Sequence, residues 1–233
     1  MHTSLGKFYS ELPKLQRGEI ERILQKDHAD EHTLQFISFN YTDILDRCVK
    51  ELSKERIIAY SDKGHVFQYT VLSSVIHVHG TLQRFPIFGV NDKSQLCEKL
   101  LFVRYFAERM LKPRAAEVTD EEWHSEAMNA IDMSTIICIY GMSLGETDAQ
   151  WFRKILRWLE KDENRHVIIY WYSNDPGDGK DPARYKCSKD TAQEGLLKFA
   201  KEGMNIEALR ERIHVVENTK KILHIKLTEK NII

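Results

Sequence analysis

One strand, one turn and one helix are predicted by residues 34–52, which read LQFISFNYTDILDRCVKEL. Leu34 to Phe39 is a short apolar run of strand length, and Asn40 follows it as a sharp turn. The residues after this turn place five apolar side chains on one helical stripe. They are Ile44, Leu45, Cys48, Val49 and Leu52. This strand–helix unit is the pattern that we expect the rest of the chain to repeat.

Three further apolar runs of strand length follow along the chain. They cover Val75 to Val78, Thr135 to Tyr140 and His166 to Tyr172. Because these runs alternate with stretches of helical period, they are typical of βα units. We therefore expect an α/β fold with a largely parallel sheet flanked by helices. At 233 residues, the chain is long enough to bury one substantial core as a single domain.

The helices after the third and fourth strands carry start signals. Thr147 and Gln150 form a capping-box pair, which satisfies backbone donors at the start of a helix. Thr191 and Glu194 form a second such pair, and Gly203 is the expected C-terminal cap of the helix that they open.

Three segments of the single domain 1–233 are expected to depart from the βα pattern. Residues 1–33 are polar and helical in character. Residues 57–70, with Asp62-Lys63-Gly64 at their centre, are expected to form a hairpin-like insertion. Residues 173–187 contain the run NDPGDG and are expected to form a flexible surface loop.

Composition limits the classes of partner and the compartment. The chain has 34 basic and 35 acidic side chains, so no overall field attracts a phosphate backbone, and nucleic acid is not an expected partner. No apolar stretch approaches the roughly 20 residues that a membrane span needs. Residues 1–10 carry no apolar run that could serve as a signal. We expect a cytoplasmic protein without a membrane partner.

The four cysteines are spaced too widely for a zinc knuckle or a compact disulfide scaffold. They are Cys48, Cys97, Cys138 and Cys187. We expect free, buried thiols, and Cys138 inside the third apolar run is the clearest example.

Polar residues follow three of the predicted strands, at the edge where ligands bind in an open parallel sheet. They are Asn40, His79 and Ser143. The short amide of Asn40 can hold a ribose hydroxyl or a water, or it can cap the helix that follows. His79 can exchange a proton near neutral pH, or it can be a hydrogen-bonded histidine that closes a strand.

Two other chemistries fit parts of the same segments. His77 and His79 lie two apart on a strand, so they face the same side and can chelate a metal. No third and fourth ligands are evident, and we expect no metal. Gly141, Ser143 and Gly145 match the G-x-S-x-G pattern of a serine hydrolase. The late candidates for the other triad members are Asp175 or Asp178 and His214 or His224.

Three segments, FNYTDIL (39–45), HVHG (77–80) and YGMSLGETD (140–148), share their order and approximate spacing with a known set of blocks. They resemble the conserved blocks of the AbiH family of phage abortive-infection proteins, with FGVND (88–92) as a weaker fourth. The likeness covers roughly residues 35–170. That family is similar to the sirtuin-like domains of bacterial antiphage systems, which share a Rossmann-type fold and in many cases hydrolyse NAD.

The resemblance implies a role for each residue at the strand ends. Asn40 would place the nicotinamide ribose or the attacking water, and His79 would act as a base on the ribose hydroxyl. Gly141 and Ser143 would line the adenosine side of the site. The other nucleotide-binding residues that it implies are Tyr41, Asp43, Gly80 and Asp148, the last near the start of the next helix.

The resemblance also implies what the chain lacks. Typical sirtuin deacylases hold a structural zinc with two C-x-x-C pairs, which are absent here, so protein deacylation is not expected. No glycine-rich strand and turn precedes Asn40, and the G-x-G of residues 177–179 lies in a polar loop. We expect the first β unit of a sirtuin-like fold to be absent, or to be supplied by a second chain or a second copy of this one.

The sequence thus predicts an antiphage abortive-infection protein that binds a small nucleotide, NAD, with NAD glycohydrolase activity as the hypothesis. Asn40 and His79 are its expected catalytic residues. A nucleotide-sensing or interaction module without turnover, and an esterase-like hydrolase that depends on Ser143, are the two alternatives.

Overall fold

The structure of the chain is a computed structural model that describes residues 5–26, 31–61, 64–83, 97, 121–173, 182–219 and 222. Within these ranges the strands form two three-stranded sheets. The first has the order β1 (Glu31–Ser38), β3 (Val66–His77), β2 (Ile57–Tyr60), and the second has the order β4 (Ile136–Tyr140), β5 (His166–Trp171), β6 (Ile213–Glu217). The described helices are α2 (Lys14–Lys26), α3 (Ile44–Leu52), α7 (Glu121–Met133), the 3₁₀ turn η2 (Glu146–Asp148), α8 (Ala149–Glu160), α9 (Pro182–Leu197) and α10 (Ile206–Glu211).

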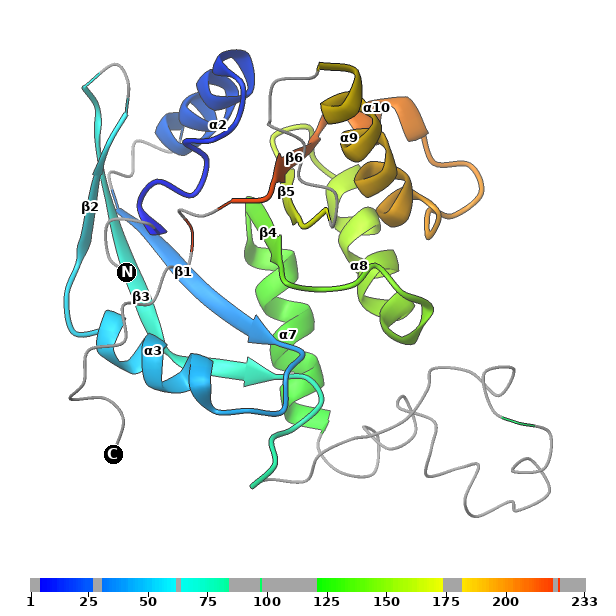
Figure 1. Cartoon of the computed structure of the whole chain (residues 1–233). Coiled ribbons are helices and arrows are strands. Elements are labelled where there is room, and N and C mark those ends of the chain that lie inside the picture. Colours follow the sequence, from blue (N-terminus) through cyan, green and yellow to red (C-terminus); the bar gives the residue numbers. More distant parts are fainter. Residues whose placement is uncertain are drawn as a thin grey trace.

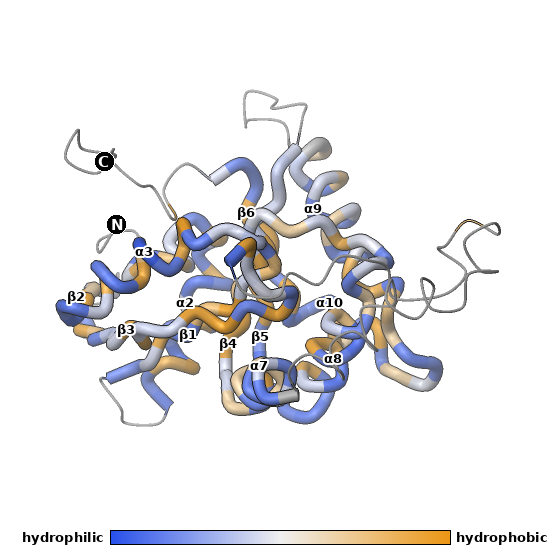
Figure 2. The backbone as a smooth tube through the Cα atoms, turned by 90° about the horizontal axis from the view of Figure 1, so that it is seen from below, coloured by the Kyte–Doolittle hydropathy of each residue, from blue (hydrophilic) through white to orange (hydrophobic). Residues whose placement is uncertain are grey.

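Among the described strands, three of the four strand pairs are parallel. β1 pairs in parallel with β3, and β4, β5 and β6 run parallel throughout, whereas β2 pairs with β3 in the antiparallel sense. The sheets lie edge to edge, with β1 beside β4, in both Figure 1 and Figure 2. The order in space is therefore β2, β3, β1, β4, β5, β6. The parallel connections leave this junction in opposite directions, from β1 to β3 on one side and from β4 through β5 to β6 on the other. The junction is therefore a topological switch point.

Apolar side chains cover both faces of the second sheet. Along β5, Val167 and Ile169 belong to a core cluster that also contains the apolar face of α8. Ile168 and Tyr170 belong to a second cluster, which joins α2 to the first sheet. A strand that is buried on both faces has a continuous apolar sequence instead of an alternating one, as the run VIIYW does here.

The four predicted strands are present, with differences at their ends. β1 begins at Glu31, so the predicted helical segment 1–33 ends in a strand, while α2 accounts for its helical character. The predicted hairpin is confirmed as β2 with the start of β3. It is not an insertion, because β3 continues without interruption to His77 and pairs with β1.

Neither predicted capping box forms at a helix start, although α8 does begin close to Thr147, at Ala149. The residue before α8 is Asp148, which makes no side-chain capping bond, because the 3₁₀ turn η2 leads the chain into the helix and replaces a capping box at Thr147. Thr191 lies inside α9, where its hydroxyl donates to the carbonyl of Cys187 one turn earlier at 2.8 Å. That helix ends at Leu197, before Gly203.

The predicted loop 173–187 is wrong in its last part, because residues 182–187 are already in α9. The sequence patterns did not reveal α7, α10 or β6. Several residues of interest lie outside the described ranges. They are the FGVND block, Asp175, Asp178, His224 and the glycines of residues 177–179.

The cysteines are free, as expected, but they are not buried. Cys48 is half-buried, and the other three are exposed. Cys138 is exposed by its residue surface, but its sulfur accepts a hydrogen bond from the hydroxyl of Tyr170 at 3.9 Å, and burial raises the pKa of the thiol to about 12. Among the described residues, no helix combines the length and apolar character that crossing a membrane requires.

Candidate functional site

Three segments that are far apart in the sequence meet beyond the strand ends at the switch point. His79 follows β3, Tyr41 follows β1, and Asp148 ends the turn after β4. The Nε2 atom of His79 lies 2.8 Å from Oδ1 of Asp148. The rings of Tyr41 and His79 have their centroids 6.3 Å apart and are inclined by 31°. A histidine, a carboxylate and a phenol therefore converge on one point.

Backbone geometry fixes the position of His79. Gly80, the next residue, is buried and has a φ of 69°, in the left-handed region that glycine adopts without strain. Its N–H donates to the carbonyl of His77 at 3.2 Å and closes a tight turn around His79. Beyond this turn, the N–H of Leu82 donates to the carbonyl of Tyr41 at 2.9 Å, which ties the segments after β1 and β3 together.

The imidazole of His79 packs against an aromatic side chain, which in turn packs against a second one. The edge of the Phe39 ring meets the imidazole at a centroid distance of 5.4 Å, and Phe39 in turn packs edge-on against Trp151 of α8 at 5.7 Å. His79 is only 4% exposed and Trp151 only 1%. The ring of His79 is thus held in one orientation by packing on one side and by a carboxylate on another.

The electrostatics of the site are dominated by the carboxylate of Asp148. Burial, and then the negative charge of Asp148, raise the pKa of the Tyr41 hydroxyl above its ordinary value of 10.0. Tyr41 therefore stays a neutral phenol at pH 7, able to donate or accept a hydrogen bond. Histidine, aspartate and tyrosine are all side chains that can transfer protons in catalysis.

Asn40 lies between the two aromatic residues that contact His79. It is exposed, and its side chain makes no hydrogen bond to any residue in the described ranges. Its backbone is fixed instead: its N–H donates to Oγ of Ser38 at 3.2 Å, and its carbonyl lies 3.2 Å from Nδ1 of His77. Asn40 does not cap a helix, because the residue before α3 is Asp43. Its amide is open to solvent at the edge of the site.

His77 and His79 do not form a chelating pair. Nε2 of His77 lies 2.8 Å from Oδ2 of Asp46 in α3, whereas His79 contacts Asp148 on the other side. The strand ends at His77, so the alternation that would place both rings on one face no longer applies. Among the described residues, one group of three side chains could hold a metal ion. It lies elsewhere, near the amino ends of β5 and β6.

Three further predicted nucleotide-binding residues lie on the segments that follow β1 and β4. Gly141 directly follows β4 with a φ of 62° and is exposed. Asp43 pairs with Arg47 one helical turn away at 3.3 Å, so its carboxylate is engaged along α3. Ser143 is exposed on the turn between β4 and η2.

The geometry of Ser143 does not fit a nucleophile elbow. Such a serine sits on a strained strand-to-helix turn, but among the described non-glycine residues only Asn218 has a positive φ. His214, one of the two histidines considered for a triad, is bonded to His166 near the amino ends of the strands, away from Ser143.

The pairing of His79 with Asp148 is the feature that the sequence did not reveal. Each residue follows a predicted strand, but 69 positions separate them, and no local pattern connects them. The contact depends on β1 and β4 being neighbouring edges, which only the three-dimensional arrangement shows (Figure 1).

Comparison with known proteins gives one match. The model of a family described as bacteriophage abortive infection AbiH matches residues 4–170 of the chain. No curated protein and no solved structure matches it. The matched range contains every residue of the His79 site and ends inside β5.

Proposed function

The chain belongs to the AbiH family of bacteriophage abortive infection proteins, and from this premise we propose that it acts in phage defence by hydrolysing NAD at the His79 site. The contact that carries this proposal is the bond of 2.8 Å between Nε2 of His79 and Oδ1 of Asp148. The proposed place of action is the cytoplasm, where a phage replicates and NAD is available.

The chemistry needs a base and a negative charge at one point. Hydrolysis adds water across the bond between ribose and nicotinamide, and it releases nicotinamide, ADP-ribose and a proton. Positive charge develops on the ribose as this bond breaks, so a carboxylate held nearby stabilises the transition state. His79 accepts the proton of the attacking water or of a ribose hydroxyl, and Asp148 stabilises the resulting imidazolium.

The surroundings of the pair suit a dinucleotide. Helices α3 and α8 both begin at this edge, and the residues before them, Asp43 and Asp148, make no side-chain capping bonds. Their first backbone N–H groups can therefore receive the oxygens of a diphosphate. Ligands of open α/β sheets bind at such switch points, which supports a Rossmann-type relation to sirtuin-like NAD-hydrolysing domains. The exposed amide of Asn40 would then orient the ribose.

The test is the release of nicotinamide from NAD by purified protein, followed by chromatography. We expect release by the wild type, and release slower by about a hundredfold or more in His79→Gln and in Asp148→Asn, because a positioned base contributes on that order. His65→Gln is the matched control, since His65 is an exposed histidine in the hairpin between β2 and β3. An inactive wild type, or a His79→Gln variant as fast as the wild type, would contradict the proposal.

The burial of His79 favours a second candidate function. With only 4% of its surface exposed, the imidazole can serve to shape the pocket instead of reaching the substrate. The protein would then sense a nucleotide without turnover. This candidate predicts that NAD raises the melting temperature while no nicotinamide forms, and that Asn40→Ala reduces the shift.

A further inference from the structure

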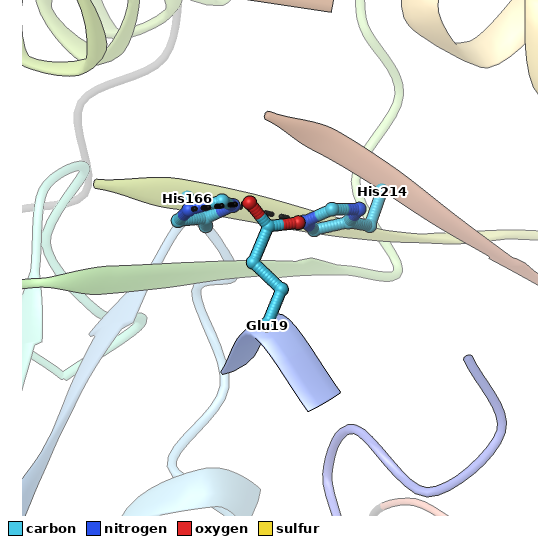
Figure 3. A group of neighbouring side chains, drawn as sticks. All are labelled: Glu19, His166 and His214. Atoms are coloured by element: carbon cyan, nitrogen blue, oxygen red, sulfur yellow. Dashed lines mark hydrogen bonds and ion pairs between the residues drawn. The ribbon is translucent and has the colours of Figure 1, made fainter. Parts of the chain in front are cut away.

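A cluster of three metal-ligand side chains lies at the amino ends of β5 and β6, on a different edge of the sheet from His79. It consists of Glu19 from α2, His166 at the first position of β5 and His214 at the second position of β6 (Figure 3). One candidate ligand atom from each residue lies within 4.8 Å of the other two. The two imidazoles lie edge to edge with nearly parallel planes, inclined by 4°, and with centroids 5.1 Å apart.

The two histidines are buried and incompletely bonded. Each is 1% exposed. Nδ1 of His166 lies 2.9 Å from Nε2 of His214, and this single contact uses one nitrogen of each ring. Within the described part of the chain, Nε2 of His166 and Nδ1 of His214 have no hydrogen-bond partner. A buried polar atom without a partner is costly, and such atoms often mark a missing ion or water.

We propose that Glu19, His166 and His214 bind one divalent transition-metal ion of the zinc class, through one nitrogen of each imidazole and one carboxylate oxygen. The two unpartnered nitrogens lie at opposite ends of the bonded ring pair, so the ion takes only one of them, and it replaces the contact between the two rings. Two histidines and one carboxylate are a recurrent set of ligands for such ions. In a tetrahedral site, ligand atoms that each lie about 2.1 Å from the ion are about 3.4 Å apart, so the cluster would contract by about 1 Å on binding.

The carboxylate of Glu19 completes the site and opens it to solvent. Its Oε1 atom lies 3.9 Å from Nε2 of His166, and its side chain is 40% exposed, so an ion can enter from that side. Nearby cations oppose binding: Arg22 and Arg212 act on His166, and Lys189 acts on His214. The negative charge of Glu19 would therefore offset these cations and stabilise a divalent ion at this point.

The ion would join α2 to the second sheet. Glu19 is the ligand from the N-terminal helix, whereas both histidines belong to adjacent parallel strands. Binding would then stabilise the docking of α2, independently of the chemistry at His79. This site runs against the expectation of a metal-free protein that the sequence alone suggested.

The test is metal binding to the full chain after removal of metals by chelation and dialysis. We expect one Zn²⁺ per chain by calorimetry, and a visible absorption band of tetrahedral Co²⁺ when cobalt replaces zinc. Glu19→Gln should weaken binding at least tenfold, since even the loss of a residue behind a ligand costs about 10–100-fold. Zn²⁺ should also raise the melting temperature of the wild type and not that of His214→Gln.

Glu160→Gln is the matched control, because Glu160 is an exposed glutamate at the end of α8 and should leave the affinity unchanged. Glu19 is half-exposed, so its conservative variant tests the ligand without emptying the core. Binding of substantially less than one ion per chain, or equal affinities in the wild type and Glu19→Gln, would overturn the proposal.

Discussion

At the scale of single residues, the arrangement of the candidate site rests on a few conformations that only particular side chains allow. The turn after β3 holds His79 against Asp148, and the turn exists because Gly80 has a φ of 69°. An L side chain at this angle places its Cβ too close to the backbone, at a cost of roughly 1–2 kcal/mol. The glycine thus links the local backbone directly to the position of the imidazole.

We expect Gly80→Ala to lower the free energy of unfolding by about 1–2 kcal/mol, because alanine is strained at a positive φ. Urea denaturation measures the change. Gly18→Ala is the opposite control: Gly18 lies inside α2, and nothing lies within 4 Å of an added Cβ. That variant should gain about 0.5–1 kcal/mol through helix propensity. If both variants were more stable than the wild type, the expectation that alanine strains the turn at Gly80 would be wrong.

The buried pair His166 and His214 predicts a pH dependence of stability. Burial and the neighbouring His214 ring lower the pKa of His166 from 6.5 to about 3, and burial lowers that of His214 to about 4. In the unfolded chain both groups titrate near their ordinary pKa of about 6.5. Between these values the unfolded state binds more protons than the folded state, so stability falls as the pH is lowered through this window. Above about pH 6.5 these groups contribute no further change.

The expected slope is at most about 1.4 kcal/mol per pH unit for each histidine. Urea denaturation in the presence of a chelator, from about pH 4 to 7, measures it without the effect of bound metal. The double variant His166→Gln/His214→Gln should give a flatter profile, while His65→Gln, at an exposed position, should keep the wild-type slope. Identical slopes in the double variant and the wild type would show that these rings do not control the acid sensitivity.

At the scale of elements, sequence patterns predicted the strands well and the helix ends poorly. The run around Val167 was recognisable because a strand covered on both faces is apolar throughout. The pair Thr147 and Gln150 matched a capping box, but that match cannot show that a 3₁₀ turn leads into α8. The cap that does form, Asn205 accepting from the N–H of Ala208 at 3.1 Å, precedes a helix of only six residues. So short a helix has too little periodicity to be recognised.

Helix α8 shows which contacts hold an element in place. Leu156 is fully buried, whereas Lys154 forms a partly exposed ion pair of 2.5 Å with Asp132 of α7. We expect Leu156→Ala to lower the free energy of unfolding by about 2–5 kcal/mol, because it leaves a cavity. Lys154→Ala should cost less than about 1 kcal/mol, since exposed ion pairs contribute little. Thermal or urea denaturation ranks the two, and a larger loss for Lys154→Ala would contradict this view of the packing.

At the scale of the whole molecule, the candidate site is a product of strand order. The sequence placed Asn40 and His79 after strands, and the structure confirms both positions. It could not show that the edges of β1 and β4 face each other, because no local pattern encodes which strands become neighbours in space. Asp148 therefore appeared only as a nucleotide-binding residue near the start of the next helix, as the family resemblance implies. Its role as the partner of His79 follows from the junction between the sheets (Figures 1 and 2).

The part of the chain after residue 170, where the family match ends, also belongs to the fold through contacts between distant segments. Strand β6 pairs with β5 along its whole length, and α9 and α10 pack against the same core. The core side chains from this part are Ala192, Leu196, Leu197, Phe199, Leu209, Ile213 and Val215. These elements are thus part of the same sheet and core as β4, the strand that precedes Asp148, and they do not form a separate unit.

A chain that ends at Trp171 should therefore fail to fold, although it contains the whole of the His79 site. Loss of α9, α10 and β6 would uncover one edge of β5 and the apolar face of α8. Each of the six missing core side chains larger than alanine normally contributes about 1.5–3 kcal/mol through burial. Because domains are stable by only about 5–15 kcal/mol, this loss exceeds what the fold can absorb. Circular dichroism should show no cooperative thermal transition in the shortened chain and a single one in the full chain. Cooperative unfolding of the shortened chain near the melting temperature of the full chain would mean that the matched range is a folding unit by itself.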